Sequence, residues 1–147
     1  MRREHHGFTL IEVMVAFAII ALLLALTPIA YRKVHDALSY RAAVSDVISA
    51  LKQARIDAIL HGRPVELVIR LDERRLEGPG QKPTLIAEGI RIDTHTALRD
   101  DALPIIRFYP DGSATGGSIS LTSPGGRSSR IDIDWLTGGL QHTASSG

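Results

Sequence analysis

A long apolar stretch near the amino terminus constrains the fold of this chain more than any other feature. Residues 8–30 are almost wholly apolar, and no residue from Val13 to Tyr31 carries a charge. As a helix with a rise of ~1.5 Å per residue, the uncharged part alone would be ~28 Å long, close to the hydrocarbon thickness of a bilayer. The stretch therefore predicts a helix that crosses a membrane once.

One carboxylate, that of Glu12, interrupts the start of this stretch. A charged group near the centre of a bilayer costs about 2.5–3.5 kcal/mol on insertion scales. The residues alone leave two explanations open. Glu12 can lie in the first turns of the helix, near the lipid headgroups and the positive end of the helix dipole. Alternatively, it pairs with a cation that another copy or a partner supplies.

The residues before the stretch form a short polar leader, residues 1–7, which contains two arginines and ends at Gly7. A secretory signal peptide would have an apolar core of about 7–15 residues followed by a small-x-small cleavage site, and this chain lacks that order. The residues G-F-T-L-I-E, from Gly7 to Glu12, resemble instead the signal of type IV prepilins and type II secretion pseudopilins. This resemblance implies cleavage between Gly7 and Phe8 by a prepilin peptidase, and N-methylation of Phe8.

The resemblance also implies a partner for Glu12, because pilin-like filaments pair this glutamate with the amino terminus of a neighbouring subunit. A carboxylate and an amine offset each other's desolvation when they are buried together, whereas either alone is penalised. We therefore expect Glu12 to act in assembly, and the helix to be both an anchor and a packing element. The arginines before the span favour a cytoplasmic leader, so the rest of the chain would be exported.

At 147 residues, the chain has room for one folded domain beside the apolar stretch. Pro28 predicts a kink in the helix, although a tolerated membrane proline would give the same sequence. After Tyr31, apolar residues recur at three- and four-residue steps and predict an amphipathic continuation over residues 31–62, which Gly62 ends. The predicted apolar face consists of Val34, Leu38, Val44, Val47, Ile48, Leu51, Ala54 and Ala58.

From residue 63 to residue 147 the apolar period changes to two, and turn residues separate short segments. This pattern predicts an α+β fold, in which the long amino-terminal helix packs on a carboxy-terminal domain of antiparallel sheet. Residues 95–102 are expected to form a loop and residues 143–147 to be frayed. The predicted strands are residues 65–71, 75–77, 84–87, 90–93, 104–109, 118–122 and 130–135, with a last short strand near Leu140.

Two segments of this second half, Phe108–Leu121 and Arg130–Gly139, resemble the carboxy-terminal domain shared by GspH and FimT proteins. These are minor pseudopilins of type II secretion and minor pilins of type IV pili. The resemblance implies a structural subunit of the type II secretion pseudopilus, which aids export of folded proteins across the outer membrane. It also implies a single-pass inner-membrane protein with its β-rich domain in the periplasm. The implied partners are other minor and major pseudopilins, prepilin peptidase, the inner membrane and the secretion machinery.

The residue pattern contains no catalytic, cofactor or metal site. The chain has no cysteine, its six histidines do not stand at ligand spacing, and it lacks a phosphate-binding glycine loop and a nucleophile elbow. An enzyme, such as an anchored hydrolase, is therefore not expected. Without residues 1–7 the chain would be formally neutral, which argues against nucleic-acid binding. The alternative is a FimT-like minor pilin that binds DNA during uptake, for which Arg127 and Arg130 are the available basic residues.

Overall fold

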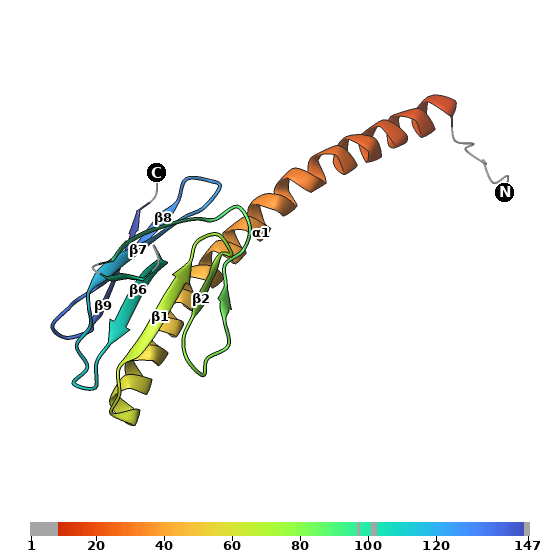
Figure 1. The fold of residues 1–147 in the computed structure, drawn as a ribbon. Helices are drawn as coiled ribbons and strands as arrows, with labels where there is room; N and C mark the ends of the chain where they lie inside the picture. Colours follow the sequence, from red (N-terminus) through yellow and green to blue (C-terminus); the bar gives the residue numbers. More distant parts are fainter. Residues whose placement is uncertain (1–8, 97, 101–102, 146–147) are drawn as a thin grey trace, which may run out of the picture. The chain divides into compact units, whose positions relative to one another are not determined.

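The structure is a computed structural model that describes residues 9–96, 98–100 and 103–145, without the side chains of residues 25–34 and 98–100. The chain divides into two compact units, residues 1–35 and residues 36–147. One helix, α1 (Leu10–His61), contributes to both units. The remaining elements are strands, and all of them belong to the second unit (Figure 1).

Helix α1 confirms the prediction of one long helix, with its start two residues later than residue 8. The leader and the Gly7–Phe8 junction lie outside the described residues. Residue 28 is helical and α1 is unbroken there, but the side chain of Pro28 is not described, so the kink stays a prediction.

Within the described residues, no helix has both the length and the sustained apolar character that a membrane crossing requires. The crossing expected over residues 8–30 includes residue 8 and the side chains of residues 25–30, which the structure does not describe.

The strands form two antiparallel sheets, so the predicted α+β class is confirmed. The order in the first sheet is β3 (Thr84–Leu85), β2 (Arg75–Glu77), β1 (Val65–Arg70), β6 (Leu103–Phe108) and β5 (Leu98–Asp100). The order in the second sheet is β4 (Arg91–Thr96), β7 (Gly117–Thr122), β8 (Ser128–Ile133) and β9 (Leu140–Ser145).

Two expectations for the sheet region were wrong. Residues 95–102 are not all loop, because β4 continues to Thr96 and β5 pairs with β6 from Leu98 to Asp100. The carboxy-terminal end is not frayed from residue 143, because β9 pairs with β8 as far as Ser145. The strands β4, β5 and β9 each lie at the edge of a sheet. Edge strands can keep many polar residues, and therefore they give little apolar alternation in the sequence.

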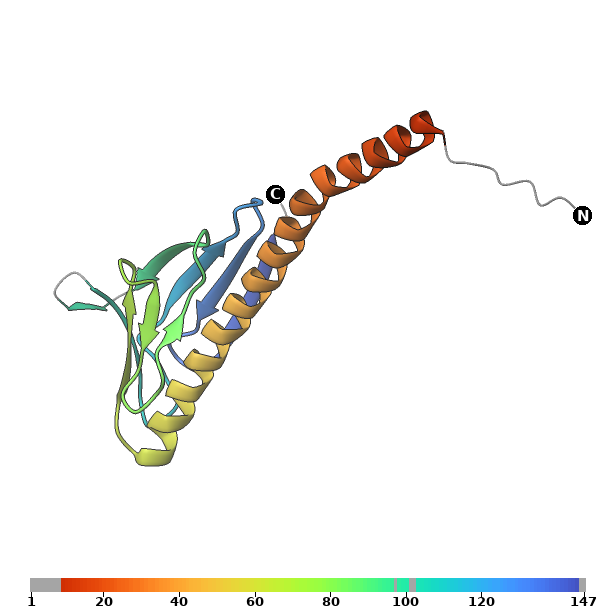
Figure 2. The same ribbon diagram turned by 90° about the vertical axis from the view of Figure 1, so that its right-hand side faces the viewer.

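The second half of α1 and both sheets share one hydrophobic core, and Figure 2 shows this part of the helix running alongside the sheets. The helix contributes Val47, Leu51, Ala54 and Ala58, each fully buried. The largest fully buried side chain is that of Phe108 on β6. The amphipathic half of the helix is thus packed as predicted, against the side of the sheets that carries the apolar residues of each strand.

Two positions of the predicted helix face differ from expectation. Leu38 is 61% exposed and takes no part in the core. Tyr40, which the apolar pattern did not include, is buried, and its hydroxyl donates a hydrogen bond to the Leu121 carbonyl oxygen at 3.2 Å. A tyrosine can occupy a core position when its hydroxyl finds such a partner.

Candidate assembly and binding surfaces

The first half of α1 exposes apolar side chains on every side. All residues from Leu10 to Leu24 are exposed, among them Leu10, Ile11, Met14, Phe17 and Leu22. A helix that is apolar on all sides is normally buried, either in lipid or among neighbouring helices. The described residues of the chain itself provide no cover, so this surface is suited to packing against other molecules.

Glu12 lies in the first turn of this apolar helix, and its backbone N–H donates to the Thr9 side-chain oxygen at 3.3 Å. Thr9 therefore caps the helix, in the T-x-x-E pattern of a capping box. The T-x-x-E spacing from Thr9 to Glu12 is the sequence signal for this cap. The glutamate is exposed, and among the described residues its carboxylate has no ion-pair partner. Its position at a helix start fits the first explanation, and its lack of a partner leaves room for the second.

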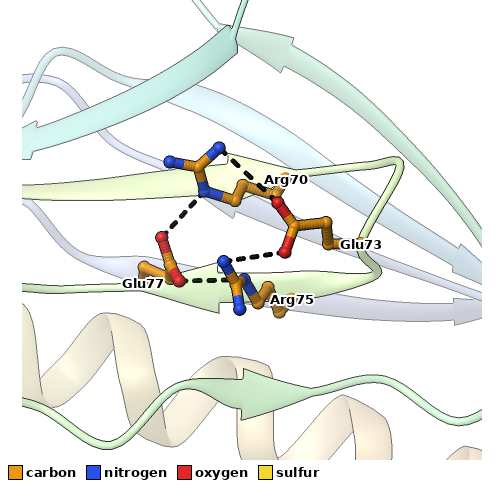
Figure 3. Close-up of polar contacts among 4 residues, drawn as sticks. All are labelled: Arg70, Glu73, Arg75 and Glu77. Carbon is orange, nitrogen blue, oxygen red and sulfur yellow. Dashed lines mark hydrogen bonds and ion pairs between the residues drawn. The ribbon is translucent and has the colours of Figure 1, made fainter.

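The outward side of the first sheet carries charges that are paired with each other. Arg70 and Arg75 share the carboxylates of Glu73 and Glu77, with nitrogen–oxygen distances of 2.7–3.7 Å (Figure 3). The hydrogen bond from Arg70 to Glu77 raises the pKa of Arg70 above its ordinary value. Because these side chains remain partly exposed to solvent, the pairs contribute only modestly to the stability of the fold.

The same pairing extends to the neighbouring strands β1 and β6. Arg107 lies opposite Glu66 in the ladder and donates to its carboxylate at 2.5 Å. This hydrogen bond is the main reason why the pKa of Arg107 is raised. This side of the sheet therefore offers little unpaired positive charge to an anionic ligand.

An open groove of about 620 Å³ lies between α1 and the strands β8 and β9. Its basic lining residues, Arg41, Lys52 and Arg127, have no carboxylate partner among the described residues. The guanidinium carbon of Arg127 lies 5.6 Å from the centre of the Tyr40 ring, within cation–π range. The apolar part of the lining comes from Tyr40, Val44, Ile48 and Ala144.

A second open groove, of about 910 Å³, lies between α1 and the β2–β3 connection. Asp57 accepts a hydrogen bond from Gln81 at 3.0 Å and thereby holds this connection on the helix. The lining contains Asp46 and Asp57 as well as Arg63 and Lys82, so its charges are mixed.

Two turns are attached to α1 by one arginine. Arg55 donates to the Gly112 carbonyl oxygen at 3.0 Å and to the Thr137 carbonyl oxygen at 2.9 Å. In the second of these turns Asp134 accepts hydrogen bonds from Thr137 and Leu136, and the Thr137 backbone bond is the main reason why the pKa of Asp134 is lowered. Asp134 thus ends β8 at Ile133, two residues before the predicted end at residue 135.

Within the described part of the chain, no group of three or more His, Asp or Glu side chains is placed to hold a metal ion. The basic residues considered for DNA binding lie in different settings. Arg130 is exposed and its Nε lies 2.8 Å from Asp132 Oδ1, whereas Arg127 covers Tyr40.

Comparison with known families covers both parts of the chain. Residues 2–27 match the model of the prokaryotic N-terminal methylation motif, and residues 43–138 match that of the type II transport protein GspH. The type II secretion system protein H of Xanthomonas campestris pv. campestris is 32% identical over 142 residues, which cover 94% of this chain and 83% of that protein.

Solved structures show the same fold in more distant proteins. The minor pseudopilin EpsH of the Vibrio cholerae type 2 secretion system matches with a TM-score of 0.57 and 21% identity, over 70% of this chain and 94% of that one. The type IV minor pilin FimU of Pseudomonas aeruginosa matches with a TM-score of 0.57 and 14% identity, over 72% and 92% of the two chains. At these identities the likeness concerns the fold alone.

Proposed function

The chain belongs to the GspH family, the minor pseudopilins of type II secretion, and on this basis we propose that it enters the pseudopilus through the exposed half of α1. The resulting filament would aid export of folded proteins across the outer membrane. The role would be structural, because the exposed apolar half of α1 is suited to packing against other molecules. Its partners would be other minor and major pseudopilins and the secretion machinery.

The proposal begins with processing of the amino terminus. The match to the N-terminal methylation motif over residues 2–27 supports cleavage between Gly7 and Phe8 by a prepilin peptidase, followed by N-methylation of Phe8. The motif and the family also suggest anchoring at the inner membrane. We propose that residues 8–30 supply this anchor in a single pass and that residues 63–147 lie in the periplasm, with Pro28 as the point where the helix bends.

Assembly would then depend on Glu12. The observation that carries the proposal is that this carboxylate is exposed on a helix that is otherwise apolar all round, without an ion-pair partner among the described residues. When such helices pack together, the carboxylate loses its water. The freed amino group of a neighbour's Phe8 would offset that loss. The pair would thereby set the register between subunits.

Replacement of Glu12 with leucine tests this proposal. We expect Glu12→Leu to reduce incorporation into the filament by at least about tenfold, because breaking a buried ion pair costs about 3–5 kcal/mol. The measurement is the amount of the chain that cross-links to sibling pseudopilins in cells carrying the secretion system. Glu12→Asp should restore part of it.

Glu88→Leu is the matched control, because Glu88 is also exposed but lies in the second unit. This variant should assemble like the unchanged protein. If Glu12→Leu cross-links as efficiently as Glu88→Leu, the proposed role of Glu12 is wrong. Circular dichroism of both variants checks that they have the same helix and strand content.

The DNA-binding alternative is not favoured by a specific observation. It depends on Arg127 and Arg130 acting together as a basic element, and Arg130 is engaged with Asp132. The similarity to FimU concerns the fold and does not support a shared function.

A further inference from the structure

The groove between α1 and the strands β8 and β9 leaves one face of an edge strand uncovered. On β8, the inward-facing Ser129 and Ile131 are buried. Their direct partners across the ladder, Ala144 and His142 on β9, point to the same side of the sheet and are nevertheless exposed. The core thus covers the inner face of β8 and reaches Leu140 on β9, but it leaves His142 and Ala144 uncovered. A chain segment laid in the groove would complete the cover.

The strand β9 also has an open edge. It is the last strand of the second sheet and pairs with β8 alone among the described strands. An unpaired sheet edge offers backbone donors and acceptors to an added strand, and side-chain pockets beside the edge give such an addition its specificity. The groove floor, with Val44, Ile48 and Ala144, is such a pocket for apolar side chains.

The charge of the groove selects the ligand. Arg41 and Lys52 stand on α1 and Arg127 on the β7–β8 turn, and the lining contains no carboxylate. The second groove has acids and bases together, and the outward face of the first sheet has its arginines paired. The groove beside β8 and β9 therefore carries positive charges that no carboxylate in its lining neutralises. Such a charge would attract and orient an anionic segment.

The spacing of the cations gives the length of that segment. Arg41 and Lys52 are separated by eleven positions of the helix, which corresponds to ~16 Å along its axis. An extended strand covers ~16 Å in about five residues. Two carboxylates four residues apart lie on the same face of a strand, and the long side chains of arginine and lysine reach the remaining distance.

We propose that this groove binds an extended, acidic segment of a partner protein, which adds to the edge of β9. The apolar side chains of the segment lie on Val44, Ile48 and Ala144, and its carboxylates meet Arg41, Lys52 and Arg127. This inference concerns the folded second unit and does not depend on the proposed processing or on Glu12. Duplex DNA is the less suitable ligand, because specific DNA binding usually neutralises more phosphates than three cations can.

The test uses the full-length chain in non-ionic detergent and a fluorescent peptide, Thr-Glu-Thr-Val-Thr-Glu-Thr, blocked at both ends, in which both glutamates and the valine between them share one face of the strand. We expect saturable binding at low salt that weakens as salt is added. A peptide with lysine in place of both glutamates should bind at least about tenfold more weakly, because like charges then face each other across the groove.

Two pairs of variants locate the binding. Arg41→Glu with Lys52→Glu should weaken peptide binding at least about tenfold, whereas Lys82→Glu with Arg91→Glu changes the net charge equally and should have little effect. Ala144→Phe fills the groove and should abolish binding. Thr143→Phe places the same ring on the opposite face of β9, so binding should persist.

The proposal is overturned if the acidic and basic peptides bind alike, or if both charge-reversed pairs weaken binding equally. It is also overturned if Thr143→Phe blocks the peptide as well as Ala144→Phe does. A labelled DNA duplex is included as a further probe. If the duplex binds and loses affinity in the Arg41 and Lys52 variant while the acidic peptide does not bind, the groove recognises phosphate and the peptide proposal is wrong.

Discussion

The two halves of α1 show how differently one helix can be used. From Leu10 to Leu24 almost every side chain is apolar, and all of these residues are exposed. From Asp36 to His61 the helix is mixed in character, yet Val47 and Leu51 are fully buried. The half with the greater hydrophobicity thus has the smaller share in the core. The second half is covered by its own chain, whereas the described residues leave the apolar side chains of the first half exposed.

The largest expected effect that separates the two halves comes from shortening one leucine in each. Leu51→Ala should lower the free energy of unfolding by about 3–5 kcal/mol, because the side chain is fully buried and its loss leaves a cavity. Leu22→Ala should change it by less than about 0.5 kcal/mol, because Leu22 is 62% exposed. Urea unfolding of the full chain in detergent, followed by circular dichroism, measures both.

A volume-conserving variant checks the cause. Leu51→Met should cost less than about 1.5 kcal/mol, since it keeps the core filled. Equal losses for Leu51→Ala and Leu22→Ala would show instead that the first half of the helix belongs to the cooperative fold.

A smaller effect is expected where a turn meets the second half of α1. Gly138 has φ +59°, and a Cβ there would lie 2.2 Å from the Gly112 carbonyl oxygen and 3.0 Å from Arg55 Nε. Gly138→Ala should therefore cost about 2–3 kcal/mol of unfolding free energy. Gly126 also has a positive φ, of +82°, but nothing lies within 4 Å of its added Cβ. Gly126→Ala should cost only about 1 kcal/mol, and an equal cost at both glycines would show that the close approach does not matter.

The smallest expected change is in how the stability of the fold depends on pH in acid. Hydrogen bonds from Thr137 lower the pKa of Asp134 below its ordinary value of 3.8, so the folded state favours the carboxylate. The stability that Asp134 contributes is fully present above that value, and it is lost as the pH falls through the lowered pKa of the folded state. Asp134→Asn should flatten this loss in acid unfolding curves, whereas Asp36→Asn, which removes an exposed carboxylate from α1, should not. Identical curves for all three proteins would contradict the assignment.

Much of this architecture was predictable because its signals are periodic. Apolar spacing is enough to predict the helix and the alternating strands around Leu67 and Ile131, and with them the α+β class. The full extents of the edge strands β4, β5 and β9 do not follow from the sequence, because their pairing comes from backbone hydrogen bonds that leave little apolar pattern. Tyr40 was missed for a related reason, because its burial depends on a carbonyl of β7 that is distant in sequence.

The candidate surfaces also differ in how far the sequence alone predicts them. Glu12 was found because a charge among apolar residues is conspicuous in one dimension. The cations Arg41, Lys52 and Arg127 come from positions far apart in the chain, and only the packing of α1 beside β8 and β9 brings them to one groove. The pairing of Glu66 with Arg107 and the contact of Arg55 with two turns likewise depend on strand order and turn placement.

The cap at Thr9 has a consequence for maturation. Because α1 begins at Leu10, a cut ahead of Phe8 would shorten the chain without removing one rung of the helical hydrogen-bond ladder. The new terminus would stand directly before the capping threonine. The mature subunit would then leave the peptidase with its helix already complete, and joining its neighbours would require no refolding of that segment.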